Sequence, residues 1–78
     1  MQKITIYTTP MCAFCKMTKA FFKEHNITYE EKDVANSHAL AEEMVKKSGQ
    51  MAVPVIDIDG QIITGFDQAK LSELLNIK

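Results

Sequence analysis

Cys12 and Cys15 are the only cysteines in this chain of 78 residues, and two residues separate them. They follow a short β-branched and aromatic segment and stand where a helical pattern begins. The unpaired N–H groups of a helix's first turn, with the positive end of its dipole, stabilise an anion at that place. A thiolate is such an anion, and CxxC spacing lets the second sulfur reach the first. We therefore interpret Cys12 as a nucleophile and Cys15 as its resolving partner.

A metal site is the alternative use of this cysteine pair. A tetrahedral zinc ion needs four ligands, and besides the two cysteines only His25 and His38 are obvious candidates. His25 lies about 15 Å along the helix from Cys15, at about 1.5 Å per residue, which is too far for both to bind one ion. The spacing therefore disfavours an intrachain zinc site.

Length and composition indicate one domain that covers residues 1–78. A chain this short buries only about 60% of the surface that its unfolded form exposes, so we expect a thin core. Apolar residues make up 46% of the sequence and charged residues 24%, as in ordinary globular proteins. This composition excludes disorder as the main state of the chain.

The charges narrow the choice of partners. The net charge is −1, which gives no basic face for nucleic acid, and all nine Lys and Arg positions are lysines. The N-terminal residues lead directly into a strand, without the long apolar run of a signal peptide or a membrane span. We therefore expect a cytoplasmic protein with no membrane partner, where an isolated CxxC serves redox or metal chemistry.

The hydrophobic pattern predicts elements in the order β-α-β-α-β-β-α. In sequence these are a strand at 3–7, a helix from Ala13 to His25 with Asn26 at C′, a strand at 27–34, a helix capped by Asn36 or Ser37 and ended by Gly49, a strand within 50–58 that Pro54 opens, a strand at 61–64, and a short helix capped by Asp67 and striped by Leu71, Leu74 and Leu75. Thr8 and Thr9 are candidate caps for the first helix, with Pro10 in its opening turn. Asp59-Gly60 predicts a type I′ hairpin turn.

Three motifs lie on this series of elements. Cys12-Ala13-Phe14-Cys15 follows the first strand, Val53-Pro54 opens the third, and Gly65-Phe66-Asp67 precedes the last helix. With them the chain resembles a glutaredoxin of the thioredoxin superfamily over essentially its whole length, and is most similar to the short bacterial glutaredoxin-like proteins. The resemblance implies a thioredoxin-like α/β fold, in which three helices flank a four-stranded mixed sheet with its first two strands parallel and its last two antiparallel.

The resemblance also implies a function. Glutaredoxins are thiol–disulfide oxidoreductases that reduce protein disulfides or glutathione mixed disulfides, so disulfide-containing proteins are the expected partners. We expect a monomer with no bound cofactor and with glutathione as a co-substrate. One alternative is a thioredoxin-like electron carrier that a thioredoxin-reductase-like flavoprotein recharges. The rival from another class is a metal- or iron–sulfur-binding module that uses Cys12, with a cluster shared between subunits.

The resemblance also implies which residues of this chain would bind substrates. The resemblance implies a cis Val53–Pro54 bond beside the reactive sulfur, with the Val53 backbone pairing with the substrate's main chain. Glutathione would contact Lys19 and the Val53 backbone, while Asp67, in the Gly65-Phe66-Asp67 stretch, would meet its amino group. The candidate substrate-binding residues are thus Phe14, Lys19, Val53, Pro54, Gly65 and Asp67.

The chain departs from the family pattern at several of these positions. Ala13 and Phe14 stand where dithiol glutaredoxins usually have Pro and Tyr, Thr9 replaces a lysine, and Gln68 replaces the second Asp of a Gly-Gly-x-Asp-Asp stretch. Phe14 is either a core-edge residue or an exposed docking residue. Asp67 is first a helix cap and second a ligand contact.

Overall fold

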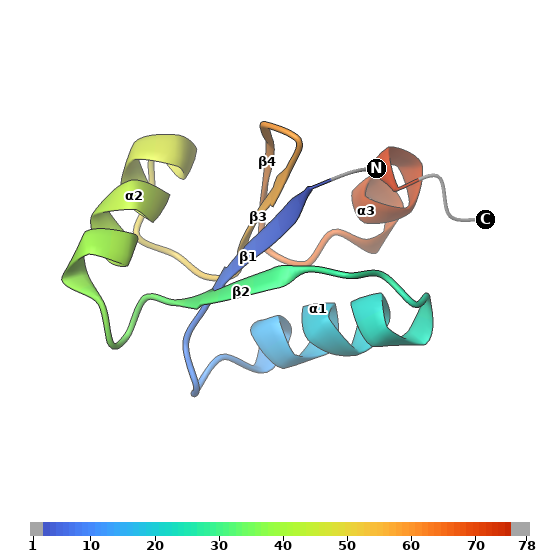
Figure 1. Cartoon of the computed structure of the whole chain (residues 1–78), viewed down its shortest axis with the longest axis horizontal. Helices are drawn as coiled ribbons and strands as arrows, with labels where there is room; N and C mark the ends of the chain where they lie inside the picture. The colour runs from blue at the N-terminus through green and yellow to red at the C-terminus, as the bar shows by residue number, and fades with distance from the viewer. Residues whose placement is uncertain (1–2, 76–78) are drawn as a thin grey trace.

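The structure is a computed structural model that describes residues 3–75, with helices on both sides of a single sheet (Figure 1). The elements are β1 (Ile4–Thr8), α1 (Ala13–Glu24), β2 (Glu30–Asp33), α2 (His38–Ser48), β3 (Val55–Ile58), β4 (Gln61–Thr64) and α3 (Gln68–Leu74). This order confirms the predicted series of strands and helices.

The sheet is mixed, with the strand order β2-β1-β3-β4. β1 runs parallel to β2 and antiparallel to β3, and β3 and β4 form an antiparallel hairpin. All five residues of β1 are buried, as expected for a central strand covered on both faces. The predicted four-stranded mixed sheet, with its first two strands parallel and its last two antiparallel, is confirmed.

Alternate residues of β1 supply two separate cores, because successive side chains of a strand point to opposite faces. Ile4 and Ile6 pack with Phe21 and Phe22 of α1 and with Leu71 of α3 in the larger core. The smaller core on the other face forms around Tyr7, and it also contains residues of α2 and β3. Helices α1 and α3 therefore cover one face of the sheet and α2 covers the other (Figure 1).

Several local signals act as the sequence indicates. Ser37 caps α2 by accepting a hydrogen bond from the N–H of Leu40, and Gly49 ends that helix at φ 78°. Asp59 and Gly60 have φ values of 51° and 93°, which is the sign pattern of a type I′ turn. Asp67 caps α3, as predicted. These features depend on residues close in sequence, and the sequence predicts each of them.

Helix α1 begins at Ala13, as predicted, but the predicted caps are wrong. The N-cap is Cys12, and neither Thr8 nor Thr9 has this role. Thr8 instead ends β1, and its buried hydroxyl donates a hydrogen bond to Glu31 on β2. The carbonyl oxygen of Thr9 accepts from the N–H of Cys12 at 3.3 Å, so Pro10 lies in the turn before the helix and not in its first turn. β1 continues one residue further than predicted because Thr8 pairs with Asp33 of β2 and its carbonyl oxygen accepts the N–H of Val34 at 3.0 Å.

Two predicted strands are also too long. β2 covers only Glu30–Asp33 of the expected 27–34, and β3 begins only at Val55, after Pro54. The buried face of α1 consists of Cys15, Thr18, Phe21 and Phe22. Phe14, which the sequence left as either a core-edge or an exposed residue, is 58% exposed and does not belong to this face.

Candidate active site

Cys12 occupies the N-cap of α1, in an extended backbone conformation. Its Sγ accepts a hydrogen bond from the backbone N–H of Cys15 at 3.1 Å. Both cysteines carry free thiols; Cys12 is half-buried, whereas Cys15 is fully buried. The first turn of the helix therefore presents a backbone donor to the more accessible sulfur, where it stabilises negative charge.

Cys15 differs from Cys12 in its surroundings. Burial raises the pKa of the Cys15 thiol to about 12, and the hydrogen bond and charge of Cys12 act in the same direction. The backbone at Thr9 and the charge of Lys19 oppose this rise in pKa, because both favour the thiolate. At neutral pH Cys15 is therefore a protonated thiol behind the accessible sulfur of Cys12.

The sheet register brings the three sequence motifs to one end of the molecule. Tyr7 near the end of β1 pairs with Val55 at the start of β3, which in turn pairs with Thr64 at the end of β4. The CxxC segment follows the first of these strands, the Val53-Pro54 segment precedes the second, and the Gly65-Phe66-Asp67 segment follows the third. Three segments that are far apart in the sequence thus lie together at the same end of the strands.

The second and third motifs are directly bonded. The N–H of Gly65 donates to the carbonyl oxygen of Pro54 at 2.8 Å. The Val53–Pro54 peptide bond is cis, as the resemblance implied, with Pro54 buried and Val53 half-buried. Gly65 has φ 78°, a left-handed conformation that favours glycine. The glycine therefore fixes the loop that follows β4 against the segment before β3.

Lys19 has a partner within the protein. Its Nζ lies 2.9 Å from Oε2 of Glu31, and the same oxygen accepts the Thr8 hydroxyl at 2.9 Å. The hydrogen bond to Glu31 raises the pKa of Lys19, and the hydrogen bond from Lys19 lowers the pKa of Glu31. A ligand carboxylate would therefore compete with Glu31 for this ammonium group.

The cluster of Thr8, Lys19 and Glu31 is absent from the sequence-based site. It depends on the parallel register, which sets Ile6 opposite Glu31 and brings the latter beside the end of β1. The polarity of the predicted strand and the alternation of its side chains were the signals that could have placed Glu31 there. The Lys19 side chain is only 27% exposed.

The remaining predicted residues are exposed. Phe14, between the cysteines, is 58% exposed, and Met11, next to Cys12, is 92% exposed, so apolar side chains border the accessible sulfur. Of the two readings of Phe14, the exposed position is the observed one. Oδ1 of Asp67 accepts the N–H of Lys70 at 3.1 Å, so this carboxylate caps α3 as expected.

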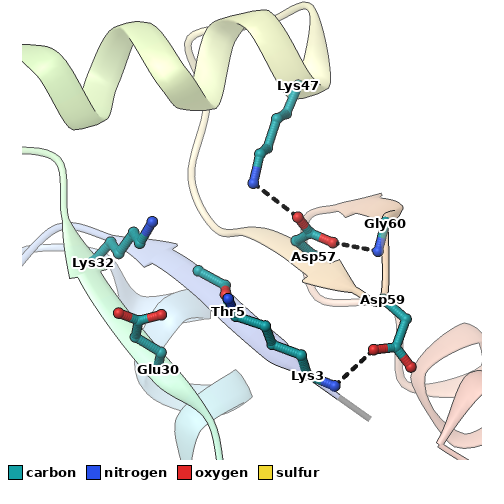
Figure 2. Close-up of a pocket in the computed structure, with 8 residues that line it drawn as sticks. All are labelled: Lys3, Thr5, Glu30, Lys32, Lys47, Asp57, Asp59 and Gly60. Atoms are coloured by element: carbon teal, nitrogen blue, oxygen red, sulfur yellow. Dashed lines mark hydrogen bonds and ion pairs between the residues drawn. The ribbon is translucent and has the colours of Figure 1, made fainter.

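A separate charged pocket lies at the opposite end of the sheet (Figure 2). Its lining residues are Lys3, Thr5, Glu30, Lys32, Lys47, Asp57, Asp59 and Gly60. Lys47 pairs with Asp57 at 2.9 Å, and the backbone N–H of Lys3 donates to Asp59 at 2.7 Å. The ion pair links α2 to β3, and the backbone hydrogen bond links the residue before β1 to the hairpin turn.

Residues 3–75 contain neither a metal-binding cluster nor a membrane-spanning helix. No group of three or more His, Cys, Asp and Glu side chains is arranged to hold a metal ion. In the same part of the chain, every helix is too short or too polar to cross a membrane.

Comparison with known proteins gives consistent matches. The glutaredoxin family model matches residues 4–63. A glutaredoxin-like 8.6 kDa protein in a rubredoxin operon of Clostridium pasteurianum is 46% identical over 72 residues, which are 92% of this chain and 96% of that protein. Glutaredoxin 3 of Escherichia coli strain K12 is 37% identical over 67 residues, 86% of this chain and 81% of the relative.

The structural comparison agrees with the sequence comparison. A crystal structure of a mutant of the thioredoxin-like protein BC3987 matches with a TM-score of 0.92 at 37% identity, over 100% of both chains. The family match, the thioredoxin-like sheet and the CxxC at the start of α1 all lead to the same result. The chain therefore belongs to the glutaredoxin family, and it is a thiol–disulfide oxidoreductase with a thioredoxin-like fold.

Proposed function

We propose that the chain reduces disulfides by a dithiol mechanism, with Cys12 as the nucleophile and Cys15 as the resolving thiol. The observation that carries this assignment is the contrast between the two sulfurs. Cys12 is the accessible one and accepts a backbone hydrogen bond at 3.1 Å, whereas Cys15 is buried behind it. The thiolate is the attacking species in thiol–disulfide exchange, so the exposed sulfur with a donor attacks first.

The reaction then proceeds in two exchanges. The Cys12 thiolate attacks one sulfur of the target disulfide, forming a mixed disulfide and releasing the other target sulfur as a thiolate, which takes up a proton. Cys15 loses its proton and attacks Cys12 Sγ, which breaks the bond to the target and forms the Cys12–Cys15 disulfide. The target gains two electrons and the enzyme loses two.

Protein disulfides and glutathione mixed disulfides are the proposed substrates. The Val53 backbone beside Pro54 would pair with the main chain of the substrate, next to Gly65, and Phe14 would supply apolar contact. Asp67 would meet the amino group of glutathione. Lys19 would meet a glutathione carboxylate only by leaving its 2.9 Å contact with Glu31. This competition weakens the contribution of Lys19 to a glutathione site formed with Val53 and Asp67.

Glutathione is the proposed reductant, without a resident cofactor, and the working form is a monomer in the reducing environment of the cytoplasm. A thioredoxin-reductase-like flavoprotein is the second candidate electron source. Two features favour the flavoprotein, because both reduce the positive charge available to the carboxylates of glutathione. The ammonium group of Lys19 is paired with Glu31, and Thr9 stands in place of a lysine. The two candidates share the same dithiol chemistry.

The test is turnover with each electron source supplied separately. A glutathione mixed disulfide and a protein disulfide are assayed with glutathione and its reductase, and then with NADPH and a thioredoxin reductase. Activity with glutathione supports the proposed glutathione-binding site at Lys19, Val53 and Asp67. Activity with the flavoprotein alone contradicts glutathione as reductant while keeping the dithiol mechanism. Visible absorbance from protein prepared without oxygen would instead indicate a cluster on Cys12.

A further inference from the structure

The mechanism leaves one step without an explanation, because the resolving thiol is buried and protonated. Cys15 is completely inaccessible to solvent, and burial raises the pKa of its thiol to about 12. It must nevertheless reach the mixed disulfide as a thiolate, since the thiolate is the reactive species. Some group near Cys15 must therefore favour its ionised form.

Lys19 is positioned to do this. It lies four residues after Cys15 on α1, so the two side chains are neighbours on the same helix face. Its Nζ is held at 2.9 Å from Glu31 on β2, and the Thr8 hydroxyl holds the same carboxylate oxygen from β1. Strands β1 and β2 together thus fix a cation beside the buried thiol.

We propose that Lys19, held by Glu31, is a positioning residue for the resolving step, in which its ammonium charge stabilises the thiolate of Cys15 while that sulfur attacks the mixed disulfide. This inference rests on the proposed dithiol function and extends it. In this step Lys19 keeps its contact with Glu31 and does not bind the target. It acts through Cys15, by charge across a region with little water, where such interactions are stronger than in bulk solvent.

The balance of charges around Cys15 changes as the reaction proceeds. While Cys12 is free, its hydrogen bond and its charge raise the pKa of Cys15 together with burial. Both contributions from Cys12 end when its sulfur enters the mixed disulfide, because the sulfur is then neutral. The charge of Lys19 remains, and it favours the Cys15 thiolate. Cys15 therefore ionises more readily after the first exchange, while burial still raises the pKa of its thiol.

The charged and titratable groups in this region come from several elements. Cys12 and Lys19 act on Cys15 from α1, and the Thr9 backbone acts from the preceding loop. From β2 and the segment before it, Glu31 and Tyr29 act on Lys19. Lys19 is a cation that acts directly on Cys15 and favours its thiolate. A neutral replacement of Lys19 therefore removes the group that favours the thiolate.

The test separates the two exchanges in a single turnover. Reduced protein in excess is mixed with dithiodipyridine, an uncharged disulfide whose thiopyridone product absorbs light. Cys12 releases the first thiopyridone and Cys15 the second, so two phases report the two steps. In Lys19→Met we expect an unchanged first phase. The second phase should slow about tenfold at neutral pH, and its pH profile should move up by about one unit.

Control variants distinguish the charge from the ion pair. Lys19→Arg should restore the second phase, because arginine keeps the charge. Glu31→Gln breaks the same ion pair but retains the ammonium, so the second phase should slow by less than about threefold. Lys23→Met removes a lysine one turn further along α1, and both phases should stay unchanged. Urea unfolding of each variant identifies any general loss of stability.

The outcomes separate this inference from the function on which it rests. A second phase in Lys19→Met within twofold of the wild-type rate would overturn the role of Lys19 alone. Equal slowing in Lys19→Met and Glu31→Gln would also overturn it, since the ion pair and not the charge would then matter. Wild-type protein that releases a single thiopyridone would contradict the dithiol mechanism itself.

Discussion

The backbone N–H of Gly65 donates a hydrogen bond to the carbonyl oxygen of Pro54 at 2.8 Å, joining two segments that are separated by the whole β3–β4 hairpin. The bond ties the loop before α3 to the segment that we propose as the docking edge for substrates. The geometry of that edge depends on the φ of 78° at Gly65.

Gly65→Ala should therefore impair both stability and activity. A Cβ at this position meets no atom within 4 Å, so the cost comes from the left-handed backbone alone, about 1–2 kcal/mol. Because a shift of the Pro54 segment misplaces the substrate, kcat/KM with a protein disulfide should fall about tenfold or more. Gly60→Ala is the control, since Gly60 also has a positive φ and open space but lies in the turn at the other end of β3. Equal activity losses in both variants would show that the Gly65–Pro54 bond has no special role.

Substitution of each cysteine should have a different effect. Cys12→Ser removes the accessible sulfur and should abolish disulfide reduction. Cys15→Ser leaves the first exchange intact, so it should accumulate mixed disulfides with target proteins and retain only reactions that one thiol can perform. Mass spectrometry of the trapped adducts, with and without reductant, measures this difference. Full reductase activity in Cys12→Ser would refute the assignment of the nucleophile.

The reduced protein should lose stability at alkaline pH because of Cys15. Below pH 9 its thiol is protonated in both the native and the unfolded chain, so its contribution is constant. Above its ordinary pKa of 9.0 only the unfolded chain ionises, until the pH reaches the native value of about 12. The free energy of unfolding should therefore fall with pH in this range, by up to about 1.4 kcal/mol per unit.

Urea unfolding between neutral pH and pH 11 measures this effect. Cys15→Ala is the reference, because it keeps every other titrating group, including the tyrosines and lysines that also ionise there. The difference in unfolding free energy between reduced wild type and Cys15→Ala should shrink as the pH rises. A difference that stays constant with pH would mean that Cys15 ionises normally in the folded protein.

Two substitutions of Asp67 separate its capping role from a ligand contact. Asparagine caps helices about as well as aspartate, whereas alanine does not, so Asp67→Ala should cost about 1 kcal/mol and Asp67→Asn much less. If the carboxylate meets the amino group of glutathione, Asp67→Asn should raise the KM for a glutathione mixed disulfide about tenfold, since bonds to charged groups contribute about 1.5–3 kcal/mol. Asp59→Asn, in the distant hairpin turn, removes the same charge and should leave KM unchanged. Unchanged KM in Asp67→Asn would leave the side chain with its cap alone.

The sequence by itself determined the features that depend on neighbouring residues. Backbone preferences over a few residues set three of these features. They are the positions of Cys12 and Cys15 at a strand-to-helix junction, the left-handed turn at Asp59 and Gly60, and the cap at Asp67. The order of strands and helices follows from hydrophobic periodicity, which is also local. These signals were sufficient to predict the order of the elements and the CxxC chemistry, whereas the thioredoxin-like fold was implied by the resemblance to glutaredoxins.

The tertiary structure decided which distant residues meet. The contact of Lys19 with Glu31 depends on the parallel register of β1 and β2, two strands that a helix separates in the sequence. Packing on both faces of the sheet fixes that register, whereas the two-residue turn at Asp59 and Gly60 fixes the register of the β3–β4 hairpin locally. The sequence also misplaced the cap of α1 and left the exposure of Phe14 open.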